Sequence, residues 1–172
     1  MHKNAIPNLF TLGNLSFGIL SIIATFQNGG NFKLACLFIL LAGLMDRYDG
    51  RVARLLNVSS DIGKELDSLA DLVSFGVAPS VLIFSMYRLD QFGPIGYMLV
   101  LIFPVAGAYR LARYNCTSFD GIFMGVPITV AGSVMAVFAF FTIRNTTHHT
   151  FPIVFLIVLS YLMVSKLKIK KV

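Results

Sequence analysis

The chain has 172 residues, of which 56% are hydrophobic and only 13% are charged, and its mean hydropathy is +0.78. This composition excludes an ordinary soluble domain and indicates a single membrane-embedded domain, residues 1–172. The net charge of +6 suits membrane topology and attraction to anionic lipid, so it does not indicate a partner nucleic acid.

Six apolar stretches follow one another along the chain, separated by short turns rich in Gly, Pro, Asn and Asp. Each is long enough to cross a hydrocarbon core of about 30 Å. We therefore expect an all-α integral membrane protein. Its six transmembrane helices are predicted at residues 8–26, 32–54, 61–86, 95–114, 127–143 and 152–166.

The basic residues predict how these helices are oriented. If the amino terminus is cytoplasmic, all of the 14 Lys and Arg residues except Lys33, Arg88 and Arg144 fall on the cytoplasmic side. We expect both termini on that side of the cell membrane, which for a bacterium is the cytoplasmic membrane. The basic segment 166–171 is predicted to anchor the chain at the lipid headgroups.

Four aspartates lie where the second predicted helix ends and the third begins. Asp46 and Asp49 are spaced i, i+3, and Asp67 and Asp71 are spaced i, i+4, so each pair shares one helix face. A carboxylate inside a membrane helix costs about 2.5–3.5 kcal/mol, and this cost requires compensation. Two such faces turned together would form an oxygen cage suited to Mg²⁺ or Mn²⁺. The pattern predicts an intramembrane enzyme that acts on phosphates.

The residues around the aspartates fit the same chemistry. Gly50 would let a ligand approach the backbone, Arg54 offers a planar guanidinium to phosphate, and Ser60 can cap the third helix or reach a ligand. The alternative is a structural salt-bridge cluster. It would bury eight charges for little stability, because buried ion pairs seldom stabilise a fold. The cations of that cluster would be Arg47, Arg51, Arg54 and Lys64.

The order of these residues resembles the signature of the CDP-alcohol phosphatidyltransferase family. That signature is Asp-x-x-Asp-Gly-x-x-Ala-Arg, about eight residues, then Gly-x-x-x-Asp-x-x-x-Asp. Every fixed position is matched here, from Asp46 through Arg54 and from Gly63 through Asp71. With six predicted helices around the motif, the resemblance covers the whole chain.

The resemblance implies roles for individual residues. Asp46, Asp49 and Asp67 would bind a pair of divalent ions, Mg²⁺ or Mn²⁺, and Asp71 would complete the second metal site and act as general base. Contacts to the CDP-diacylglycerol substrate would fall on Gly50, Arg54 and Ser60. The segment Pro7-Asn8-Leu9-Phe10-Thr11 resembles the family's Pro-Asn-x-x-Thr, which adds Asn8 and Thr11. For these two, a helix cap and a backbone-bonded hydroxyl remain alternatives. The family also implies a homodimer.

The flanking segments 60–80, 110–115 and 123–127 resemble the branch of the family that uses L-serine as acceptor, and the short chain is similar to the small enzymes of Gram-positive bacteria. Arg110 and Arg113, spaced i, i+3, are the cations expected to hold the serine carboxylate. Two alternatives stay open for these arginines. They could be positive-inside charges that set the topology, or they could bind a phosphate-bearing acceptor such as glycerol 3-phosphate or inositol phosphate. From a different class, a divalent-cation transporter would also use membrane aspartates. The acids here are confined to one side, which disfavours a transporter.

Overall fold

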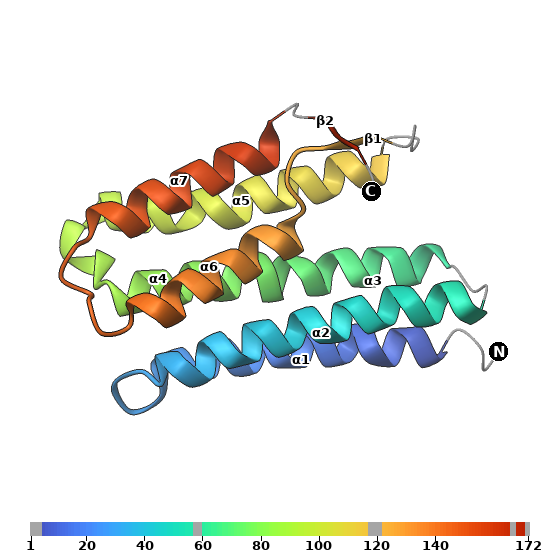
Figure 1. Cartoon of the computed structure of the whole chain (residues 1–172), viewed down its shortest axis with the longest axis horizontal. Coiled ribbons are helices and arrows are strands. Elements are labelled where there is room, and N and C mark those ends of the chain that lie inside the picture. Colours follow the sequence, from blue (N-terminus) through green and yellow to red (C-terminus); the bar gives the residue numbers. More distant parts are fainter. Residues whose placement is uncertain (1–4, 57–59, 117–121, 166–167, 171–172) are drawn as a thin grey trace.

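The computed structural model describes residues 5–56, 60–116, 122–165 and 168–170. Within these ranges, the side chains of residues 5–7, 28, 53, 54, 56, 122–124 and 168–170 are not described. The predicted all-α class is confirmed, because the described chain is built almost entirely from helices (Figure 1).

The helical elements match the six predicted stretches closely. They are α1 (Ala5–Phe26), α2 (Phe32–Leu56), α3 (Asp61–Asp71), α4 (Ala78–Met86), α5 (Pro94–Cys116), α6 (Ile128–Thr142) and α7 (Thr150–Val164). Short 3₁₀ turns, η1 (Gln27–Gly29) and η3 (Leu89–Phe92), precede α2 and α5. Three helical stretches are long and apolar enough to cross a membrane, at Asn8–Phe26, Asp61–Met86 and Pro94–Cys116, whereas α6 and α7 are apolar but have 15 residues each.

A π-helical segment, η2 (Leu72–Val77), joins α3 to α4 without a break. Pro79 follows in the first turn of α4, where its missing N–H and its ring would disturb a regular α-helical ladder. The sequence predicts that this proline breaks the α-helical hydrogen-bond ladder and kinks the helix. The α-helical ladder is interrupted by the π-helical segment over the six residues from Leu72 to Val77, and the chain stays helical through Pro79.

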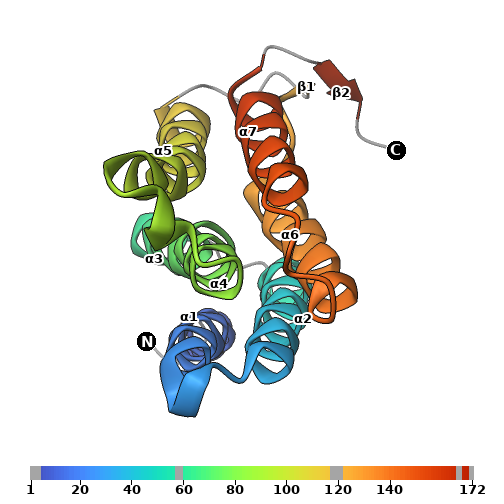
Figure 2. The same ribbon diagram turned by 90° about the vertical axis from the view of Figure 1, so that its left-hand side faces the viewer.

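The helices form a bundle with a shared long direction (Figure 1). Helix α1 packs against α2, α3, η2 and α4; α2 also packs against α6, and α5 packs against α7. Viewed along the bundle in Figure 2, α3 and α5 lie to the left and α6 and α7 lie to the right, with α7 beside α5. The beginning of α1, the end of α2, the beginning of α3 and the end of α5 all lie at one end of the bundle (Figure 1).

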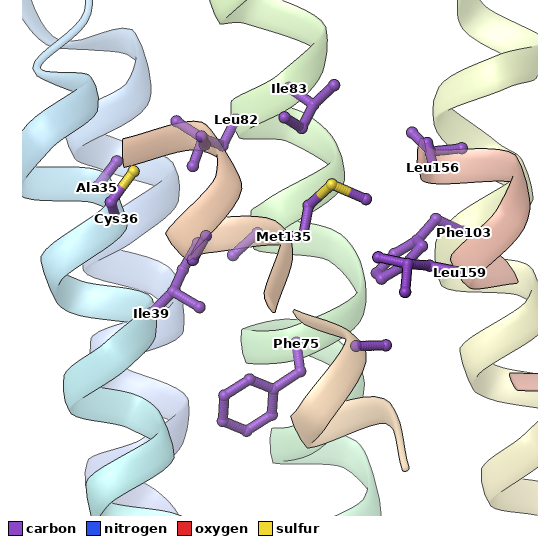
Figure 3. Packing of buried hydrophobic residues seen from close by; sticks show 14 of the residues in the cluster. Ala35, Cys36, Ile39, Phe75, Leu82, Ile83, Phe103, Met135, Leu156 and Leu159 are labelled. Carbon is purple, nitrogen blue, oxygen red and sulfur yellow. The ribbon is translucent and has the colours of Figure 1, made fainter. Parts of the chain in front are cut away.

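The buried core lies around η2 and α4, which pack against the other helices. Phe75, Leu82 and Ile83 are fully buried there. Figure 3 shows these side chains among those of α2, α5, α6 and α7, namely Ala35, Cys36, Ile39, Phe103, Met135, Leu156 and Leu159. Burial of these residues fixes the position of η2, and Asp71 immediately precedes it in the chain.

The carboxyl-terminal segment differs from the prediction. Helix α7 ends at Val164, and a short strand β2 (Lys168–Lys170) pairs antiparallel with β1 (Ile122–Met124). The last helix therefore ends shortly before the predicted boundary at residue 166, which lies outside the described residues. The reason is conformational, since Ser165 adopts extended ψ of 155° and stops the helix.

Candidate functional site

Three of the four predicted aspartates converge between α2 and α3. Asp46 from α2 and Asp67 and Asp71 from α3 each offer a carboxylate oxygen, and these oxygens lie within 4.8 Å of one another. Asp71 is only 7% exposed, and Asp46 and Asp67 are half-buried. Oxygens at this separation can share one divalent cation, because Mg²⁺ and Ca²⁺ bind oxygen at about 2.0–2.6 Å. The acid cluster, Asp46, Asp67 and Asp71, therefore fits a hard divalent cation.

The structural salt-bridge alternative has no support among the described side chains. None of the four aspartates has a Lys or Arg nitrogen within 4.0 Å in the described part of the molecule. The ion pair that is described, Arg88 with Asp90 at 3.3 Å, lies on the turn between α4 and α5. Three carboxylates crowded together without a described cation at ion-pair distance repel one another, and a bound metal ion would relieve that repulsion.

Asp49 lies beside the acid cluster and not within it. It shares a face of α2 with Asp46, it is 8% exposed, and its Oδ2 accepts a hydrogen bond from the Thr11 hydroxyl of α1. The sequence analysis did not predict this contact of Thr11. The resemblance assigns Asp49 to the metal ligands. Asp49 lies one helical turn from Asp46 of the acid cluster, and its role as a ligand of a second ion stays a prediction.

Asn14 of α1 is a site residue that the sequence analysis missed. It is fully buried, and its side-chain amide Nδ2 donates a hydrogen bond of 3.1 Å to Oδ1 of Asp71. A signal for it exists in the sequence, because four polar residues recur on one face of an otherwise apolar helix: Thr11, Asn14, Ser21 and Thr25. In the structure all four side chains are buried. In a membrane helix, such a polar face indicates contacts with partner helices.

The predicted nucleotide-binding residues lie near the same end of the bundle. The Ser60 hydroxyl caps α3 by accepting a 3.0 Å hydrogen bond from the Gly63 amide, as predicted. Asn8 lies inside α1 and cannot cap it, which corrects that alternative; its Oδ1 would be 3.3 Å from a Cβ added at Gly63. Gly50 is exposed, and apart from its own helical backbone no described residue has a heavy atom within 4 Å of an added Cβ. Arg54 lies in the last turn of α2, but its side chain is outside the described residues.

The two arginines predicted to hold a carboxylate have different surroundings. Arg110 is 8% exposed, it interacts electrostatically with Asp71, and its Nε is buried with no hydrogen-bond partner among the described residues. Arg113 donates a 3.1 Å hydrogen bond to the carbonyl of Val164 at the end of α7, and its guanidinium lies 6.0 Å from the centroid of the Tyr109 ring. Arg110 is therefore the arginine that the fold directs toward the acid cluster.

Asn115 ties this end of α5 to α3. Its Nδ2 donates to Oε1 of Glu65 at 3.2 Å and to the Ser68 hydroxyl at 3.0 Å. Lys64 donates to the Asn115 carbonyl at 3.4 Å, and its Nζ lies 5.9 Å from the centroid of the Tyr114 ring. These contacts keep Arg110 close to the helix that carries Asp67 and Asp71.

Comparison with known proteins shows the family of the chain. A model of the CDP-alcohol phosphatidyltransferase family matches residues 4–167. The chain is 40% identical to the CDP-diacylglycerol–serine O-phosphatidyltransferase of Bacillus subtilis, over 96% of this chain and 89% of that protein. It is 36% identical to the Helicobacter pylori protein of the same name, over 94% of this chain and 70% of the relative. It is also 39% identical to the archaetidylserine synthase of Methanothermobacter thermautotrophicus, over 78% of this chain and 57% of that protein.

Proposed function

The chain belongs to the CDP-alcohol phosphatidyltransferase family, and on that premise we propose that it is a membrane enzyme that transfers the phosphatidyl group of CDP-diacylglycerol to L-serine and releases CMP. The observation that carries this proposal is the convergence of Asp46, Asp67 and Asp71, the aspartates of the family motif, at one site. The choice of serine is supported by relatives named for it, which match nearly the whole chain.

The reaction is a displacement at phosphorus. The hydroxyl oxygen of serine attacks the phosphorus that bears the diacylglycerol, the bond from that phosphorus to the CMP oxygen breaks, and CMP leaves. Asp71 accepts the proton of the serine hydroxyl as general base. This role suits a carboxylate that is largely buried but lies at the acid cluster.

We assign the metal ligands to Asp46, Asp49, Asp67 and Asp71, for two Mg²⁺ or Mn²⁺ ions. When bound, such ions neutralise the diphosphate and make CMP a better leaving group. The all-oxygen donor set supports a hard cation over a softer transition metal. The same ions would offset the cost of placing these carboxylates in a membrane protein.

CDP-diacylglycerol would lie across the cytoplasmic ends of α1, α2 and the beginning of α3. Its diphosphate and nucleotide are assigned to Asn8, Thr11, Gly50, Arg54 and Ser60. The space beside the Cα of Gly50 supports this placement, since an added Cβ there would meet no side chain of the described residues within 4 Å.

Serine is assigned to Arg110 and Arg113, with Arg110 closest to the reacting groups. A guanidinium can bind the amino-acid carboxylate through two parallel hydrogen bonds. The unpartnered Nε of Arg110 supports this assignment, because a buried donor without a partner is otherwise costly.

We further propose that both termini and the active site face the cytoplasm, that residues 1–172 form one domain, and that the protein is a homodimer. The placement is supported by the basic residues at the end of the bundle that carries the acid cluster.

The test is an assay of CMP release from CDP-diacylglycerol by the purified protein in detergent or nanodiscs. We expect metal-dependent release with L-serine, and little release with glycerol 3-phosphate, inositol phosphate or no acceptor. Preference for a phosphorylated acceptor would contradict the choice of serine. Divalent-cation flux into proteoliposomes without CMP release would instead support a transporter.

A further inference from the structure

The hydrogen bond between Asn14 and Asp71 has a defined donor and acceptor. An ionised carboxylate accepts hydrogen bonds and does not donate them, so the Asn14 amide presents Nδ2 to ionised Asp71. That bond uses Oδ1 of Asp71, and no described residue donates a hydrogen bond to its Oδ2. The amide therefore fixes one carboxylate oxygen and leaves the other available.

Asn14 is held rigidly relative to Asp71. The Ser74 hydroxyl donates a 3.0 Å hydrogen bond to the backbone carbonyl of Asn14, and Ser74 lies three residues beyond Asp71 on the same continuous helix. Gly18, one turn further along α1, lets this approach occur, because a Cβ at Gly18 would lie 2.3 Å from the Ser74 hydroxyl oxygen. Both the backbone and the side chain of Asn14 are thus bonded to the helix that carries Asp71.

A purely structural role explains Asn14 poorly. Its Oδ1 is buried without a hydrogen-bond partner among the described residues. A buried polar group that is only half satisfied costs stability, and an apolar side chain of similar size would avoid that cost. An amide at this position is explained if its function is to orient the Asp71 carboxylate.

We propose that Asn14 is a positioning residue of the transfer reaction: its amide holds the Asp71 carboxylate by Oδ1 and presents Oδ2 to the acid cluster and to the hydroxyl of the acceptor. This inference rests on the proposed function of Asp71. Hydrogen-bond partners of ligating or catalytic carboxylates commonly contribute 10- to 100-fold in metal affinity or activity.

The decisive variant is Asn14→Leu, which keeps the approximate size and removes the donor. Its matched control is Ser21→Ala on the same face of α1. Ser21 is equally buried, and its hydroxyl donates a 2.9 Å hydrogen bond to the Ala35 carbonyl of α2, away from the acid cluster. Both variants lose one buried contact between α1 and a neighbouring helix.

Two measurements separate positioning from packing. At saturating metal, Asn14→Leu should lower kcat by roughly 10- to 100-fold, with each substrate KM within about threefold of the parent. Its metal-free melting temperature in detergent should stay close to that of the parent. The rise in melting temperature on adding Mn²⁺ alone should be smaller, because one carboxylate is no longer oriented. Ser21→Ala should keep both the parent kcat and the full Mn²⁺-induced rise.

The proposal is overturned if folded Asn14→Leu retains the parent kcat, or if Ser21→Ala loses as much kcat as Asn14→Leu. If Asn14→Leu fails to fold, Asn14→Ala is measured by the same two criteria. The proposed function fails separately: it would do so if the parent released no CMP with serine, whatever the variants showed.

Discussion

The carboxylates of Asp46 and Asp71 offer oxygen atoms within 4.8 Å of each other, although they come from different helices, α2 and α3. Asp46 lies just past the middle of α2 and Asp71 ends α3, and both helices pack against α1, which brings the two aspartates to one depth. Like charges this close require a cation or a proton between them. Removing, neutralising or misplacing one of them should therefore have large effects on metal-dependent chemistry.

The metal ligands should be individually essential. We expect Asp46→Asn, Asp49→Asn and Asp67→Asn each to abolish CMP release while the protein still inserts and folds, because a neutral amide cannot supply the ligand charge. Chelation of the parent should have the same effect and should be reversed by Mg²⁺ or Mn²⁺. Near-normal activity of any one variant at saturating metal would remove that residue from the ligands. Asp49 is the most informative, since it lies outside the acid cluster and is bonded to Thr11.

Asp71→Asn should separate binding from chemistry. We expect the maximal rate to fall by roughly 10²–10⁴-fold, the usual contribution of a general base. Binding of CDP-diacylglycerol should stay measurable, since three other aspartates still hold the metal ions. Titration of the variant with CDP-diacylglycerol, alongside single-turnover rates, gives both quantities. Loss of nucleotide binding with an unchanged rate on the remaining complex would show that Asp71 is not the base.

The two arginines should differ in their effects on serine. Arg110→Ala should raise the serine KM by an amount equivalent to about 1.5–3 kcal/mol, the value of a hydrogen bond to a charged group, and leave the KM of CDP-diacylglycerol nearly unchanged. Arg110→Lys should rescue only partly, because an ammonium lacks the planar fork. Arg113→Ala should also lower the melting temperature, since Arg113 bonds the end of α7.

Serinol, which keeps the hydroxyl and the amine of serine but lacks its carboxylate, provides the substrate control for both arginines. Serinol should be a poor acceptor for the parent. The difference in activity between the parent and Arg110→Ala should be smaller with serinol than with serine. Unchanged serine kinetics in both alanine variants would mean that these arginines serve only topology.

Gly50 allows ligand contact to be tested apart from folding. Apart from its own helical backbone, a Cβ at Gly50 meets no heavy atom of the described part of the chain within 4 Å, so Gly50→Ala should leave the melting temperature unchanged or slightly raised. If the nucleotide lies against this glycine, the KM for CDP-diacylglycerol should rise. Gly132→Ala in α6 is the contrasting variant. Its Cβ would lie 2.5 Å from the Phe75 carbonyl oxygen, and it should cost about 1–3 kcal/mol of stability by overpacking. Parent-like kinetics of Gly50→Ala would contradict a nucleotide contact.

The sequence alone determined the relations that lie within single helices. Apolar length gave the helical stretches, and the i, i+3 and i, i+4 spacings placed Asp46 with Asp49 and Asp67 with Asp71, because helical geometry is local. Ser60 was recognisable as a cap for the same reason, since its hydroxyl bonds an amide three residues away.

Only the tertiary structure decided the relations between helices. Which carboxylates form the acid cluster, the bond from Asn14 to Asp71, and the turning of Arg113 toward Val164 depend on which helix faces meet. Those faces are chosen by close packing at η2, where Gly18 and Gly132 let α1 and α6 approach the backbone of Ser74 and Phe75. Interatomic distances of this kind arise from the summed packing of the whole bundle, which no spacing along one helix encodes.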